Sequence, residues 1–182
     1  ERDRYAAIIR RRLLAPLGMG ATLAEFTHDN RLAMAKGYTS LHDDRPTRVS
    51  DPLVEAPWIE YGSGDGSLVS TPADLGRYLT MLLNRGMGPD GRLLSERGFA
   101  TLMQPWAPIG AEGERYGYGI FLGSLDGRPI FWHSGGMIGF SSFMVGEPEL
   151  GVGAIAFVNG PGAPGSVARF APWALTAVFG AL

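Results

Sequence analysis

Apolar residues recur every three or four positions in two stretches of the N-terminal half, which is the spacing of one face of an α-helix. The first stretch covers residues 2–14, and Pro16 follows it as a stop signal. The second begins after Ser70 or Thr71, either of which can cap a helix, and Pro72 suits its first helical position. Its apolar stripe continues until Gly86, a residue type that commonly follows a helix end. The pattern therefore predicts two amphipathic helices.

The segment between these two helices has weak periodicity and many turn-forming residues. Residues 20–62 are expected to form irregular structure with short strands, one of them around residues 32–38. Residues 43–46 are expected in a solvated loop, and the glycine-rich residues 62–66 in a flexible one. After the second helix, a shorter helix is predicted over residues 95–103.

From Tyr116 onward, the pattern changes to the alternation of apolar and polar residues that is typical of half-buried strands. The segment Leu125-Asp126-Gly127 between two such runs is a hairpin signal. Helices followed by an antiparallel meander of about four strands and a covering helix make an α+β fold. The expected strands are residues 118–124, 128–133, 140–145 and 152–158, with a turn at 147–151, a loop at 161–165 and a final helix at 167–182.

The composition is that of an ordinary folded domain, and it argues against several classes of function. Of the 182 residues, 45% are hydrophobic and 19% are charged. The net charge of -2 gives no electrostatic reason to bind nucleic acid. No apolar run reaches the roughly 20 residues that span a bilayer. The chain has no cysteine, and His28, His42 and His133 are far apart, so no metal site and no cofactor are expected.

One short segment carries candidate chemistry. Residues 132–136 read Trp-His-Ser-Gly-Gly and come at the expected end of the second strand. Glycine lets backbone approach a ligand closely, and N–H groups exposed there can hold an oxyanion. Ser134 offers a hydroxyl to a substrate, and His133 a group that titrates near neutral pH. On these residues alone, a Gly-Gly turn after a strand with a buried histidine is the favoured alternative.

Four segments, taken in order, give this stretch a family context. They are residues 16–19 (Pro-Leu-Gly-Met), 64–75 (Gly-Asp-Gly-Ser-Leu-Val-Ser-Thr-Pro-Ala-Asp-Leu), 116–119 (Tyr-Gly-Tyr-Gly) and 133–136 (His-Ser-Gly-Gly). The set resembles the serine β-lactamase-like family, which includes class C β-lactamases, D-alanyl-D-alanine carboxypeptidases and related esterases. The resemblance covers about residues 5–160 and implies the fold of that family.

The resemblance also implies roles for the residues of the last segment. His133 takes the place of the family's cationic or hydrogen-bonding side chain that faces the cleft. Ser134 takes the place of the hydroxyl that binds a substrate carboxylate or carbonyl, and Gly135 keeps the strand close to the substrate. The N–H of Gly136 would be one of two oxyanion donors, and the nucleophile's own N–H would be the other.

The chain departs from a complete enzyme of that family in its nucleophile. The family uses the serine of Ser-x-x-Lys, but the only lysine is Lys36, and the residue three positions before it is Ala33. The family's Tyr-x-Asn motif is absent too, and both motifs precede Pro-Leu-Gly-Met in the family. We therefore expect residues 1–182 to be the C-terminal portion of one domain, with a mainly helical and loop part (1–105) and a sheet with its helix (116–182).

The expected function is that of the C-terminal part of a serine acyl hydrolase acting on a small amide or ester, such as a β-lactam, a D-amino acid peptide or an ester. A missing N-terminal segment would be its partner and supply the nucleophile, so this part alone should be inactive. Two alternatives stay open, a non-catalytic family member that binds or scaffolds and an independent α+β binding module. Core packing is the default expectation for Tyr116 and Tyr118, and the alternative is that one of them faces the cleft. The compartment is left open between periplasmic or secreted and cytoplasmic.

Overall fold

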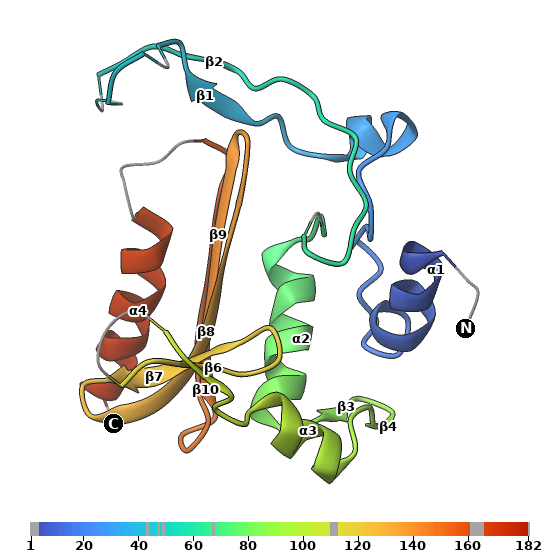
Figure 1. Cartoon of the computed structure of the whole chain (residues 1–182), viewed down its shortest axis with the longest axis vertical. Coiled ribbons are helices and arrows are strands. Elements are labelled where there is room, and N and C mark those ends of the chain that lie inside the picture. Colours follow the sequence, from blue (N-terminus) through green and yellow to red (C-terminus); the bar gives the residue numbers. More distant parts are fainter. Residues whose placement is uncertain are drawn as a thin grey trace.

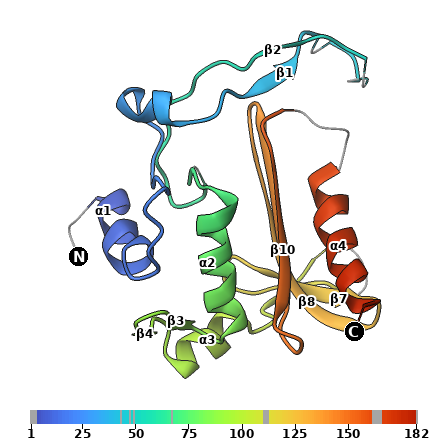
Figure 2. The same cartoon turned by 180° about the vertical axis from the view of Figure 1, so that it is seen from behind.

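A six-stranded antiparallel sheet lies between helix α4 on one face and helix α2 on the other (Figures 1 and 2). The strand order is β10-β9-β8-β7-β6-β5, so every strand pairs with its neighbour in the chain. The expected α+β class is therefore confirmed. The computed structural model describes residues 4–42, 44–46, 48, 50–66, 68–109, 113–160 and 166–181.

The elements have the following bounds. The helices are α1 (Tyr5–Ile9), the π-helical η1 (Arg10–Leu14), the 3-10 helix η2 (His28–Ala33), α2 (Pro72–Leu83), α3 (Glu96–Leu102) and α4 (Ser166–Phe179). The sheet strands are β5 (Ala107–Pro108), β6 (Arg115–Tyr116), β7 (Phe121–Leu125), β8 (Arg128–Met137), β9 (Phe140–Glu147) and β10 (Val152–Val158). Two small hairpins lie outside the sheet, β1 (Tyr38–Ser40) with β2 (Leu53–Glu55) and β3 (Met87–Gly88) with β4 (Gly91–Arg92).

Local signals placed the helices correctly. Thr71 is the N-cap of α2, because its hydroxyl accepts the N–H of Asp74 at 3.2 Å, and Pro72 is the first helical residue. Ser95 caps α3 in the same way by accepting the N–H of Gly98 at 3.0 Å. The helix predicted over residues 2–14 is present from Tyr5 and widens to π-helix in its second half, while residues 1–3 lie outside the described residues.

The four strands expected from alternation are β7 to β10, and the sheet gains β5 and β6 at one edge. The turn between β7 and β8 has positive φ at Asp126 (51°) and Gly127 (78°), which is the primed turn that the dipeptide predicts. The expected start of the first strand at Tyr118 is wrong. Tyr116 ends β6, and the chain turns before β7 begins at Phe121.

The expected end of the second strand at His133 is also wrong. Strand β8 continues to Met137, and its last residue pairs with Phe140 of β9. Glycine disfavours strands by itself, but here a partner strand runs alongside and its ladder holds the Ser-Gly-Gly segment extended. The expected loop at 161–165 lies outside the described residues.

Each face of the sheet packs on its own core. Along β9, Phe143 and Val145 join the cluster that contains Leu175 of α4, while Met144 between them joins the cluster that contains Leu82 of α2. This alternation is what the period of two in a strand requires. Leu82 and Leu175 are 0% and 1% exposed. Burying each such side chain contributes about 1.5–3 kcal/mol, so both helices hold β9 in register.

Residues 20–62 contain one short helix and one short hairpin rather than a strand at 32–38. The helix is η2, and the first strand, β1, begins only at Tyr38. The hairpin arches over the tip of the sheet (Figure 1). The side-chain amide of Asn159, just after β10, donates to the carbonyl of Lys36 at 2.9 Å and ties the arch to the sheet.

Asp74 of α2 ties the Pro-Leu-Gly-Met turn to the rest of the molecule. Its Oδ2 accepts the N–H of Ala21 at 2.8 Å and the hydroxyl of Thr22 at 2.9 Å, and its Oδ1 lies 2.6 Å from the guanidinium of Arg77. The residue is only 2% exposed. A buried carboxylate with several donors is stabilising only as long as all partners are present.

Replacing Asp74 should therefore destabilise the protein. In the full-length protein, Asp74→Ala removes the acceptor that the Ala21 N–H, the Thr22 hydroxyl and the Arg77 guanidinium share, so we expect it to lower the free energy of unfolding by about 2–3 kcal/mol. Urea denaturation followed by circular dichroism measures this loss. Asp44→Ala, at an exposed loop carboxylate, is the matched control and should change stability by less than about 0.5 kcal/mol. Equal losses in the two variants would contradict this account.

Candidate active site

The candidate residues lie on a stretch of β8 that has a partner strand on one side only. Pairing with β7 ends where Phe121 meets Trp132, whereas pairing with β9 continues over residues 133–137. Among the described residues, no strand pairs with the other side of this stretch. Residues 134–136 are exposed. We call residues 133–137 the open edge of β8.

The pairing register determines which backbone groups face this open edge. Met137 pairs with Phe140 across a two-residue loop, and the pair that closes such a loop exchanges two hydrogen bonds. Bonded and non-bonded positions then alternate along the strand. The N–H and C=O groups of Gly136 and Ser134 therefore point away from β9, toward the open edge. The groups of Gly136 and the N–H of Ser134 are available to a ligand, whereas the carbonyl of Ser134 lies 2.6 Å from Nδ1 of His133.

The two glycines of the segment differ in what surrounds them. A Cβ built on Gly136 meets no atom within 4 Å, so the space beside this residue is open. A Cβ built on Gly135 would overlap the hydroxyl of Ser142, which is its partner on β9. Gly135 thus lacks a side chain because Ser142 of the neighbouring strand occupies that space. At Gly136 it leaves room beside the backbone N–H.

His133 begins the open edge, and both of its ring nitrogens have partners. Nε2 lies 3.1 Å from the hydroxyl of Tyr116, and Nδ1 lies 2.6 Å from the carbonyl oxygen of Ser134. The ring also lies near that of Phe121, with 5.4 Å between centroids. The imidazole is therefore held beside the backbone groups that face the open edge.

Tyr116 is a residue of this site that the sequence reasoning assigned to core packing. Its hydroxyl contacts His133, although β6, which carries it, is separated from β8 by β7. The alternation Tyr-Gly-Tyr-Gly marks a strand that could present a tyrosine to a cleft. Tyr118, two residues later, is 63% exposed and packs edge-on against Trp106 at 5.7 Å between centroids.

Lys36 is not placed to activate a nucleophile. Its ammonium group forms an ion pair with Glu55 at 2.8 Å on the arch. The hydrogen bond to Glu55, together with the negative charge of that carboxylate, raises the pKa of Lys36 above its ordinary value. A lysine with a raised pKa stays protonated at neutral pH and cannot accept a proton from a serine.

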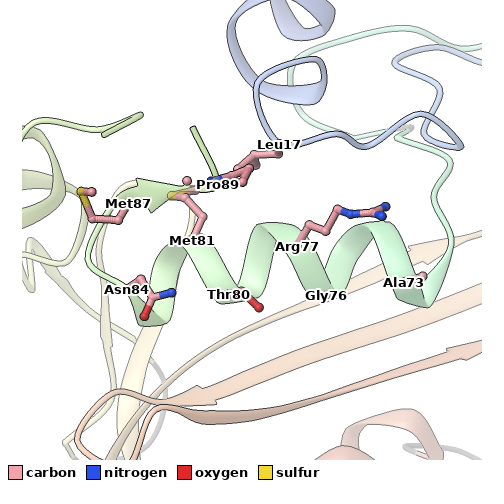
Figure 3. Close-up of a pocket in the computed structure, with 10 residues that line it drawn as sticks. Leu17, Ala73, Gly76, Arg77, Thr80, Met81, Asn84, Met87 and Pro89 are labelled. Carbon is pink, nitrogen blue, oxygen red and sulfur yellow. The ribbon is translucent and has the colours of Figure 1, made fainter. Parts of the chain in front are cut away.

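A groove of about 460 Å³ runs along the exposed side of α2, and it is separate from the open edge (Figure 3). Leu17 lies on its far wall, and Arg77, Thr80 and Met81 line it from the helix. Its lining residues include none from β8.

The described residues offer no alternative centre of chemistry based on metal. Among them, no group of three or more acidic or histidine side chains is close enough to hold a metal ion. Nor does any helix within the described ranges have the length and apolar character needed to cross a bilayer.

Known proteins resemble this chain over most of its length. The family model described as Beta-lactamase matches residues 2–177. Penicillin-binding protein 4 of Amycolatopsis lactamdurans is 32% identical over 164 residues, which are 84% of this chain and 40% of that protein.

Two solved structures extend the comparison. The octameric penicillin-binding protein homologue from Pyrococcus abyssi matches with a TM-score of 0.81 and 26% identity, over 97% of this chain and 38% of that chain. The D-amino acid amidase from Ochrobactrum anthropi SV3 complexed with L-phenylalanine matches with a TM-score of 0.61 and 26% identity, over 87% of this chain and 46% of that chain. This chain thus spans less than half the length of each of these three relatives. Because the family model covers nearly all of it, the chain belongs to the β-lactamase family of serine hydrolases.

Proposed function

We propose that this chain forms one wall of the active site of a serine acyl hydrolase, with Gly136 as an oxyanion donor and His133 as the group that polarises the substrate. Ser134 and Gly135 bind the substrate next to them. The observation that supports this role is the open edge of β8, where the N–H of Gly136 points away from β9 and has free space beside it. An oxyanion hole needs such a preorganised donor about 2.7–3.1 Å from the oxygen on which charge develops.

The reaction proceeds through an acyl-enzyme. A serine oxygen attacks the substrate carbonyl, and the negative charge that forms on the carbonyl oxygen is stabilised by the N–H of Gly136. The bond to the amine or alcohol then breaks, and that leaving group takes up a proton. Water subsequently attacks the ester of the serine, which releases the acid and restores the hydroxyl. The donors of the open edge act in both steps because each passes through an oxyanion.

The serine and its activating lysine come, in this proposal, from a segment N-terminal to this chain. Two observations support that arrangement. The chain contains no Ser-x-x-Lys and spans 40% of its penicillin-binding relative. Helix α4 carries Arg169 as its only charged residue and leaves Phe170 (55%) and Trp173 (64%) exposed. A helix that is apolar all round is normally covered on both sides. Residues 1–182 then form the C-terminal portion of one domain.

The substrate class is a small amide or ester, such as a β-lactam, a D-amino acid peptide or an ester. Relatives named as a penicillin-binding protein and a D-amino acid amidase favour amides. An extended amide can run antiparallel to the open edge, because Gly136 presents both its N–H and its C=O there and Ser134 presents its N–H. No charge on the chain as a whole favours a polyanionic substrate, since its net charge is -2.

The oxyanion role predicts a difference between two substitutions at Gly136 in the full-length protein. Gly136→Pro removes the N–H, and proline is tolerated on an edge strand where the N–H has no partner. We expect it to lower kcat for ester or amide hydrolysis by about 10²–10³-fold. Gly136→Ala keeps the N–H and has space for its methyl group, so its loss should be far smaller. Thermal melting checks that both variants fold, and similar kcat values for the two would refute the role.

Covalent labelling separates the hydrolase from a non-catalytic family member. The full-length protein, incubated with penicillin G or a fluorophosphonate, should gain the mass of one acyl or phosphonyl group, because an activated serine reacts with either. The 182-residue chain alone should neither gain mass nor turn over nitrocefin. A full-length protein that stays unlabelled under conditions where a control penicillin-binding protein reacts would support the binding or scaffolding alternative.

A further inference from the structure

The imidazole of His133 is bound at both nitrogens by partners from different strands. Nδ1 lies 2.6 Å from the carbonyl oxygen of Ser134, its own neighbour on β8. Nε2 lies 3.1 Å from the hydroxyl of Tyr116 on β6. Strand β7 lies between β6 and β8 and begins at Phe121, so it does not pair with the part of β8 that follows Trp132. The hydroxyl of Tyr116 therefore reaches the ring past the start of β7.

The two partners together determine where the ring carries its proton. A carbonyl oxygen can only accept a hydrogen bond, so Nδ1 of His133 must donate to Ser134. In the neutral ring, Nε2 is then the acceptor, and the hydroxyl of Tyr116 donates to it. In the protonated ring, Nε2 donates instead and the same hydroxyl accepts. Both hydrogen bonds thus persist in both charge states. Between the two neutral tautomers, however, the hydroxyl has a preference, because a phenol donates a stronger hydrogen bond than it accepts. It therefore favours the ring whose Nε2 accepts, which is also the ring that the carbonyl of Ser134 favours.

Tyr116 is itself held in place by packing that does not involve His133. Its ring meets that of Phe121 edge-on, with 4.6 Å between centroids and 65° between planes. Phe121 in turn stacks on Trp132 at 4.0 Å and 8°. The three residues are aligned across β6, β7 and β8, since Tyr116 pairs with Phe121 and Phe121 with Trp132. This aromatic row orients the phenol, so the hydroxyl loses little conformational entropy when it bonds His133.

We propose that Tyr116 is a positioning residue that fixes the tautomer and the orientation of His133 at the open edge. A 180° flip of the ring would place carbon atoms opposite both Tyr116 and Ser134 and lose both hydrogen bonds. The ring consequently keeps its Nδ1 proton on the carbonyl of Ser134, and the backbone groups of Gly136 stay free for the substrate. The consequence for catalysis rests on the proposed function, whereas the effect on the ring does not.

Imidazole ¹⁵N chemical shifts test the effect on the ring directly. In the full-length protein labelled with ¹⁵N-histidine, the signals of His133 are identified by their loss in His133→Gln. At a pH where the ring is neutral, we expect Nδ1 to be the protonated nitrogen and Nε2 the unprotonated one. Tyr116→Phe keeps the ring contact with Phe121 but removes the hydroxyl. It should shift the tautomer ratio toward Nε2–H by up to about fivefold, because the stronger of the two hydrogen bonds that the hydroxyl can make with Nε2 is lost.

Tyr118→Phe is the matched control, because this tyrosine is 63% exposed and contacts Trp106 instead of His133. It should leave the His133 signals unchanged. If the wild-type ring carries its proton mainly on Nε2, or if Tyr116→Phe leaves the tautomer ratio unchanged, the proposal is overturned. A Tyr116→Phe protein that only melts earlier, with an unchanged ratio, also overturns it, since a purely structural role would have that effect.

Kinetics then separate this proposal from the proposed function. If the full-length protein hydrolyses an ester or amide, Tyr116→Phe should lower kcat by about 10-fold or less with little change in KM, because ring orientation matters for the step after binding. An unchanged kcat together with a shifted tautomer would show that His133 has no part in the chemistry. A full-length protein without any turnover would refute the proposed function. The tautomer ratio would still decide the role of Tyr116.

Discussion

The hydrogen-bond ladder of β8 changes at Trp132, and the candidate site depends on that change. Before this residue, β8 has partners on both sides, and after it only β9 remains. One partner strand is enough to keep a Ser-Gly-Gly segment extended, and it leaves every second residue with its N–H and C=O unpaired. Those residues are Ser134 and Gly136, and the imidazole of His133 donates to the carbonyl of Ser134. A second partner strand would have formed hydrogen bonds with these groups. Without any partner strand, the segment would have been flexible.

The rigidity of this edge comes from packing on both faces of the neighbouring strand. β9 presents Phe143 and Val145 to α4 and Met144 to α2, so a slip in register by one residue would exchange two cores. Helix α2 is connected to the Pro-Leu-Gly-Met turn through Asp74. The donors that we assign to catalysis thus lie on an exposed edge whose partner strand is packed on both faces, as preorganised electrostatic stabilisation requires.

The proposed division of labour follows from this arrangement. A wall made of backbone donors and of an imidazole with a hydrogen bond at each nitrogen requires little rearrangement during the reaction. A nucleophile, by contrast, must change its protonation state and its bonding. In the proposal, the two kinds of group come from different parts of the chain and meet where the open edge faces the missing segment. The exposed aromatic residues Phe170 and Trp173 of α4 and the groove along α2 are further surfaces that such a segment could cover.

Features governed by nearby residues could be deduced from the sequence. The cap at Thr71, the primed turn at Asp126 and Gly127, and the α+β order of elements are examples, because they depend on side chains within a few positions. The short motif that ends at Gly136 lies on the open edge of β8. What the sequence did not determine is how far β8 extends, that β5 and β6 join the sheet, and that Tyr116 bonds His133. Each of these depends on which strand lies alongside and in which register, and those long-range pairings arise only when the chain packs.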